Sequence, residues 1–254
     1  MITLSQSSIH PYTADFIRAI RDAGGNGLLA HEIIATNNLV INLTAYQIWD
    51  KLVGLYPFVG RSDISHSFNL INPMFYRMIW FGGIVHDALG ITTNGTTGSG
   101  DTTINPGLGN NFVNSMTFGV YSRTDGVSGG VDLGAQAATN LHVKFTDGNA
   151  YFDNCFSSGR ISLAMTSALG LILSSRFASN AHSGWQNGVR IINGSGAQGT
   201  ITSATFTIAS RQVGSLFTAR NYAMCIIGYG LSDEQNVALY QAVQNFQILL
   251  NRAV

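Results

Sequence analysis

The pattern of apolar and polar residues predicts helices near both ends of the chain and short strands between them. Near the N-terminus, apolar residues recur at the spacing of one helix face. These are Phe16, Ala19, Ile20 and Ala23. A second helix is expected from about Ala30 to Leu43, and a third is expected to carry Ala45, Ile48, Trp49 and Leu52 on one face. Residues 12–55 are therefore predicted to be helical.

From Phe58 to about Tyr229, short apolar or alternating runs are separated by Gly, Asn, Asp and Ser, which is typical of an all-β fold. Asp147-Gly148-Asn149 predicts a tight hairpin, because Asp-Gly accepts the positive φ of a primed turn. Strands are expected at 66–70, 77–81, 116–122, 141–146, 150–154, 161–165, 169–175, 188–192, 204–209 and 223–227. This spacing indicates a β-sandwich or jelly roll, with 92–110 as a long exposed loop.

A last helix is predicted over 232–252. Ser232 and Gln235 have capping-box spacing, and Asp233 and Glu234 occupy the first turn. The fold class is therefore mainly β, an antiparallel sandwich with N-terminal helices and a C-terminal helix. We divide the chain into a helical segment, 1–57, for docking or oligomerisation, and a jelly-roll sandwich, 58–254.

Composition narrows the choice of partners. Only 10% of the 254 residues are charged, against about 25% in a typical domain, and Asn, Ser, Thr and Gly replace them. Such a surface suits extracellular or virion-exposed β-proteins. The 13 basic residues form no cluster that could neutralise several phosphates, so no nucleic-acid partner is expected. No apolar stretch is long enough for membrane insertion, and MITLSQSSIHPY does not have the pattern of a secretory signal.

The two cysteines, Cys155 and Cys225, cannot form a disulfide framework. Free cysteines behave as small apolar residues, so two buried thiols are expected. This favours synthesis in a reducing compartment, such as the cytoplasm of a bacterial host in which a virion assembles.

The motifs give little support for catalysis. A glycosidase needs two facing carboxylates, and only Asp147 and Asp153, which flank the predicted hairpin, could meet that need. A turn residue and a strand-end residue explain the same pair. The six histidines show no metal-ligand spacing, and no Gly-x-Ser-x-Gly nucleophile motif occurs. We expect no catalytic residue and no cofactor.

Two binding hypotheses remain. Calcium could bind the carboxylate and amide oxygens at Asp147-Gly148-Asn149 or at Asp153-Asn154, and a plain hairpin turn explains the same residues.

Trp185 lies in a polar, loop-like context and could form a flat platform for a sugar. Asn187 and Arg190 would then contribute hydrogen bonds. The alternative is an ordinary buried tryptophan.

Several segments, taken in order, resemble a module found in tail-associated and other structural proteins of bacteriophages. The likeness begins with Ala23-Gly24-Gly25 and Glu32 and continues with Ile48-Trp49-Asp50-Lys51-Leu52 and the Leu55–Gly60 run. Phe68-Asn69-Leu70 follows as that module's first sandwich strand. It continues through Thr93–Thr96 and Val120–Thr124. It ends with Ile227–Glu234 and Leu239–Gln247. Leu29 departs from the pattern, since a helix-capping Ser or Thr is expected there.

The resemblance implies a concanavalin/laminin-G-like jelly roll in a non-enzymatic virion protein, such as a tail, fibre or capsid-decoration component. It implies other virion proteins as partners, and homo-oligomers are expected because repeated virion positions are symmetric. The outward loops could bind host surface carbohydrate. Two alternatives stay open: a polysaccharide depolymerase on the same fold, and a bacterial adhesin or lectin.

Overall fold

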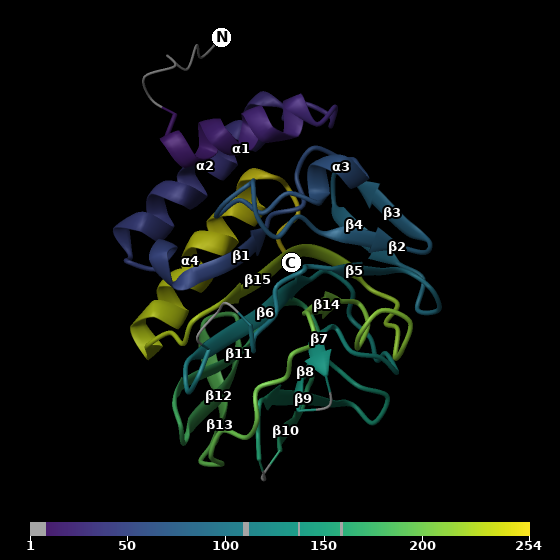
Figure 1. Ribbon diagram of the computed structural model, residues 1–254, viewed down its shortest axis with the longest axis vertical. Helices are drawn as coiled ribbons and strands as arrows, with labels where there is room; N and C mark the ends of the chain where they lie inside the picture. Colours follow the sequence, from purple (N-terminus) through teal and green to yellow (C-terminus); the bar gives the residue numbers. More distant parts are fainter. Residues whose placement is uncertain (1–8, 109–111, 137, 158–159) are drawn as a thin grey trace.

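The computed structural model describes residues 9–108, 112–136, 138–157 and 160–254. It is built in three layers, in which helices cover one β-sheet and a second sheet lies on the other side of the first (Figure 1). We call the middle sheet sheet A and the outer one sheet B. The predicted fold class is confirmed: the chain is mainly β, with two antiparallel sheets and helices toward both ends.

Sheet A has eight strands. They are β1 (Leu52–Tyr56), β3 (Ile84–Asp87), β4 (Gly90–Thr93), β6 (Met116–Ser122), β11 (Gly170–Ala178), β12 (Ala181–Gln186), β13 (Val189–Gly194) and β15 (Asn221–Gly228). Their order is β13-β12-β11-β6-β15-β4-β3, and β1 also pairs with β15. All seven positions of β6 are buried, because both faces of this sheet are covered.

Sheet B has seven strands, in the order β10-β9-β8-β7-β14-β5-β2. In chain order they are β2 (Ile79–Phe81), β5 (Ser99–Asp101), β7 (Leu133–Gln136), β8 (Thr139–His142), β9 (Asn149–Asn154), β10 (Ile161–Ala164) and β14 (Thr207–Ile208). Its inner side chains, such as Leu141 and Phe152, join Phe118 and Ile172 of sheet A in one apolar core.

The helices form the third layer. They are α1 (Pro11–Asp22), α2 (Ala30–Ala45) and α4 (Asp233–Leu249), with a short α3 (Asp63–His66) nearer the edge of the sheets. Phe16, Leu39 and Phe246 share a second apolar core with Leu173 and Met224 of sheet A. The predicted capping box of α4 is present, with the Ser232 hydroxyl accepting from Gln235 N–H at 3.2 Å. No helix in the described ranges is long and apolar enough to cross a membrane.

The predicted third helix is wrong. Helix α2 ends at Ala45, Gln47 has a φ of 56°, and one 3₁₀ turn, η2 (Trp49–Lys51), leads directly into β1. Because β1 pairs with β15, part of the 1–57 segment belongs to sheet A. The proposed role of that segment in docking stays a prediction.

Two further expectations near the start of the sandwich are wrong. The 66–70 run, which includes the resemblance's first strand, is the end of α3 and a turn. Asn69 there completes β1 through its side chain, accepting from Leu55 N–H at 3.0 Å and donating to Val53 O at 2.9 Å. The expected 92–110 loop contains the end of β4 and all of β5, while 109–111 lie outside the described residues.

The positions of the tight turns and the burial of the cysteines agree with the sequence. Gly148, at φ +82°, lies in the predicted hairpin turn between β8 and β9, but Asp147 does not share the positive φ, so this turn is not of the predicted primed type. Asn187 and Gly188 both have positive φ in the two-residue turn between β12 and β13, as a primed turn requires. Cys155 and Cys225 are both free and buried.

A buried ion pair ties the two sheets together. Asp132, just before β7, accepts from Arg220 Nε at 2.8 Å and from the Tyr222 hydroxyl at 2.7 Å. Both charged side chains are at most 2% exposed. Removing one partner would leave an uncompensated charge inside the sandwich.

We expect Arg220→Met to lower the free energy of unfolding by about 3–5 kcal/mol, because Asp132 loses its buried counter-charge. Urea unfolding would measure the loss. Arg18→Met is the control, since its pair with Asp15 is more than half exposed and contributes about 0–1 kcal/mol. Equal stability of the two variants would contradict this role for Arg220.

Burial, together with the nearby charge of Arg176, lowers the pKa of His182 to about 3. The unfolded chain therefore takes up this proton near pH 6.5, well before the folded chain does. The contribution of neutral His182 to the free energy of unfolding is therefore present above about pH 6.5 and is lost as the pH falls, by about 2 kcal/mol at pH 5. Between pH 7.5 and pH 5, the free energy of unfolding of the wild type should fall by about 2 kcal/mol more than that of His182→Gln. Parallel curves would contradict the prediction.

Candidate functional site

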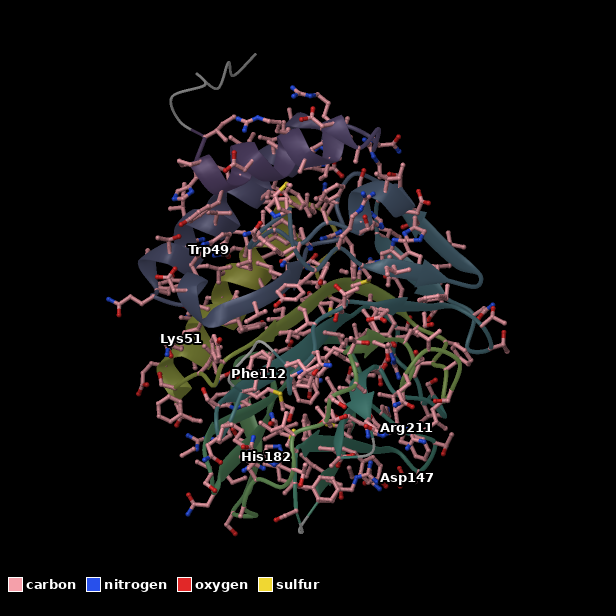
Figure 2. The ribbon with its side chains drawn as sticks, viewed as in Figure 1. Trp49, Lys51, Phe112, Asp147, His182 and Arg211 are labelled. Atoms are coloured by element: carbon pink, nitrogen blue, oxygen red, sulfur yellow. The ribbon has the colours of Figure 1, made fainter. Side chains whose placement is uncertain are left out.

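Strands β8, β9 and β10 lie at the end of the molecule opposite the helices, where a cleft of about 250 Å³ opens on sheet B. Its apolar side includes the rings of Phe145, Tyr151 and Phe156. Its polar side includes Asp153, Arg160 and Arg211. Figure 2 labels Arg211 and Asp147 in this lower part of the molecule, far from Trp49 and Lys51 on the helical side.

Strand register brings the site residues together. His142 of β8 lies opposite Tyr151 of β9, and Asn140 lies opposite Asp153. Side chains alternate along a strand, so Ala150 and Phe152 enter the core while Tyr151 and Asp153 share the outer face.

The Tyr151 ring is the centre of an aromatic cluster. The guanidinium carbon of Arg160 lies 4.0 Å from the ring centroid, in cation–π geometry. The rings of His142 and Phe145 meet it edge-on, with centroids at 5.6 and 6.0 Å. The Tyr151 hydroxyl donates to Asp147 in the preceding turn, and this bond holds the pKa of Asp147 below its usual range. These contacts fix one rigid apolar wall.

Asp153 and His142 supply polar groups beside that wall. Burial raises the pKa of Asp153 to about 6, although Arg160 Nε, at 2.7 Å from its carboxylate, favours the charged form. Burial lowers the pKa of His142. His142 Nδ1 donates to Gly130 O at 2.8 Å, because a carbonyl can only accept. The neutral ring is therefore left with Nε2 as an acceptor.

Arg211 belongs to a loop that follows β14. The loop is fastened to the sandwich by Ala209 N–H donating to Asp132 O and by Val131 N–H donating to Leu216 O. Arg211 itself donates its backbone N–H to Ser215 O at 2.9 Å. No carboxylate of the described chain forms an ion pair with its guanidinium.

The sugar platform predicted at Trp185 is wrong, because its side chain is only 3% exposed and belongs to the core under the helices. Asn187 is occupied by the turn, with its side-chain oxygen accepting from Leu171 N–H at 2.8 Å. Arg190 does line a second cavity, of about 450 Å³, beside the start of α4. There it pairs with Asp233, so the two charges satisfy each other.

The calcium candidates are engaged by protein groups. Asp147 accepts from Asn149 N–H at 2.9 Å as well as from Tyr151, and Asp153 pairs with Arg160. Asp147 lies in the turn before β9, and Asp153 lies near the far end of that strand. Across the part of the chain that is described, no group of three or more His, Cys, Asp or Glu could hold a metal ion.

Most residues of this site were not predicted from the sequence. Asp153 and Asp147 were candidates, but His142, Tyr151, Arg160 and Arg211 were not. The alternation in Asn149–Asn154 does carry the signal that Tyr151 and Asp153 share a face. Nothing in the sequence shows that loops carrying Arg160 and Arg211, more than 50 residues apart, border the same cleft.

Comparisons with known proteins agree on the fold only. No family model matches the chain, and no curated protein matches it. A botulinum neurotoxin type C structure, titled for cell entry through interaction with two ganglioside molecules, has a TM-score of 0.53 at 11% identity. That match covers 79% of this chain and 53% of the toxin chain.

A Trypanosoma rangeli sialidase in complex with a difluoro-KDN compound has a TM-score of 0.51 at 10% identity, over 82% of this chain and 39% of the sialidase. The botulinum neurotoxin serotype D binding domain has a TM-score of 0.50 at 10% identity, over 77% and 52%. This chain spans about half or less of these structures, and it is similar to them as a β-sandwich.

Proposed function

We propose that this protein is a carbohydrate-binding protein without catalytic activity, and that the cleft over β8 and β9 is its sugar site. The observation that carries the proposal is the pairing of a rigid aromatic wall, built on Tyr151, with fixed hydrogen-bonding groups at Asp153 and His142. A sugar has apolar C–H faces and a rim of hydroxyls, so it needs both kinds of surface side by side. Ligand sites in general combine an apolar lining with a few placed polar groups.

The position of the cleft also supports a binding role. It lies on a sheet face whose strands belong to a continuous core, so binding needs little reorganisation of the backbone. The neighbouring folds include a toxin that interacts with gangliosides, which makes a glycan a reasonable ligand for a sandwich of this shape.

The contacts of the two acids support a non-catalytic role. Glycoside hydrolysis uses two carboxyl groups that face each other across the scissile bond. Asp147 is engaged by the Tyr151 hydroxyl and Asn149 N–H, and Asp153 is held by Arg160. The depolymerase alternative would need a second acid near Asp153.

We further propose that the protein is a component of a bacteriophage particle, assembled in the bacterial cytoplasm. The ordered resemblance that begins at Ala23 and ends at Gln247 supports this role. Exposed apolar side chains at Met74, Phe75 and Val85 support contacts with other virion proteins or with further copies of the chain. The adhesin or lectin alternative shares the sugar site and differs in location.

We expect Tyr151→Ala to weaken glycan binding at least tenfold, because the aromatic wall and the Arg160 contact are lost together. The measurement is binding to a printed array of neutral, uronate-bearing and sialate-bearing oligosaccharides. Tyr46→Ala is the matched control, since Tyr46 is 41% exposed at the end of α2 on the helical side. The glycans bound should gain no new reducing ends on incubation with the wild type. Absence of glycan binding by the folded wild type, or release of reducing ends, would contradict the proposed function.

We expect the chain to co-purify with phage particles through a density gradient, as detected by mass spectrometry of the particle band. An unrelated cytoplasmic host protein serves as the control for carry-over. Recovery of this chain only outside the particle band would overturn the virion role and favour an adhesin or lectin.

A further inference from the structure

The cleft over β8 and β9 carries an excess of positive charge. Its lining includes two arginines, Arg160 and Arg211, and one carboxylate, Asp153. The whole chain has 13 basic and 13 acidic residues and therefore no formal net charge. The lining of this cleft differs from that balance because it has one more basic residue than acidic residues. The lining therefore favours a ligand with negative charge.

The two arginines have different roles. Arg160 is already engaged by protein groups. Its Nε donates to the Asp153 carboxylate at 2.7 Å, and its guanidinium carbon lies 4.0 Å from the centroid of the Tyr151 ring. Arg211 has no ion pair within the described ranges, and its charge reaches the site, where it contributes to lowering the pKa of His142. Arg211 is thus the group available to an incoming anion.

Asp147 is a further carboxylate near this site, in the turn before β9, and it is not part of the lining. Its oxygens accept from two neutral donors, the Tyr151 hydroxyl and Asn149 N–H. Within the described residues it forms no ion pair with Arg160 or Arg211. Asp132, the other nearby acid, is already paired with Arg220 inside the sandwich.

We propose that the cleft selects sugars that carry a carboxylate, with Arg211 as the residue that binds the carboxylate. This inference rests on the proposed function, because it names the class of glycan that the same site takes. A planar guanidinium matches a carboxylate in a two-point hydrogen-bonded pair, which lysine cannot reproduce. The sugar ring would lie against the aromatic wall while its carboxylate reaches Arg211.

The test compares matched acidic and neutral probes. Wild-type protein is assayed against oligogalacturonate, its methyl ester, sialyllactose, lactose and sulfated lactose. We expect oligogalacturonate or sialyllactose to bind at least tenfold more tightly than the methyl ester or lactose, and the preference to weaken with added salt. Which of the two acidic probes binds better tells a uronate from a sialate.

Variants assign the preference to Arg211. Arg211→Gln should lower the affinity for the acidic probe at least tenfold more than the affinity for the neutral probe, while Arg211→Lys should retain part of the preference for the acidic probe. Arg18→Gln, on the exposed surface of α1, is the control for total charge. Unchanged melting transitions would show that the variants fold.

The outcomes separate this inference from the proposed function. Equal binding of acidic and neutral sugars, preference for the sulfated probe, or an Arg211→Gln variant that keeps the acidic preference would each overturn the carboxylate assignment and leave a sugar site in place. Absence of binding to any probe and to the printed array would overturn both.

Discussion

Burial of sheet A on both faces is the constraint on which the rest of the structure depends. Strands β6 and β15 lie at its centre, and each presents one set of side chains to the helices and the other set to sheet B. The helices can pack on only one of its faces, so sheet B must cover the other. Sheet B then keeps one face turned away from the helices, and the cleft lies there. The location of the candidate site thus follows from how the core is closed.

Buried arginines connect these layers through directional hydrogen bonds, which apolar packing does not provide. Arg252, 1% exposed, donates to Pro57 O at 2.6 Å, Phe58 O at 2.9 Å and Ala223 O at 3.0 Å. It therefore ties the chain's end to the segment after β1 and to β15. Burial lowers its pKa to about 9, a cost that is offset by these directional bonds. Arg220 does the same between the sheets, with Asp132 as its counter-charge.

The elements that could be predicted from the sequence are those with local causes. Strand β6 agrees with its predicted bounds because Met116, Phe118 and Val120 recur at every second position, and the Asn187-Gly188 turn follows from the positive φ that these residues tolerate. Strand β1 could not be predicted in the same way. Leu52 and Leu55 fit a helical face, and only pairing with β15 and the side chain of Asn69 makes them a strand. Long-range hydrogen bonds overrode the local pattern there.

The site was harder to predict because its charged residues come from different loops. Arg160 and Arg211 are far apart in the sequence, so they form no charge cluster that could be recognised there. Trp185 has polar neighbours, which favour an exposed loop, yet these residues belong to β12 and to the tight turn that follows it, and the ring packs in the core under the helices. Arg211 has no motif around it. Asp153 is paired with Arg160 and Asp132 with Arg220, whereas Arg211 has no ion pair within the described residues. Its charge can therefore be matched by a ligand, which is the physical reason to look for specificity at Arg211.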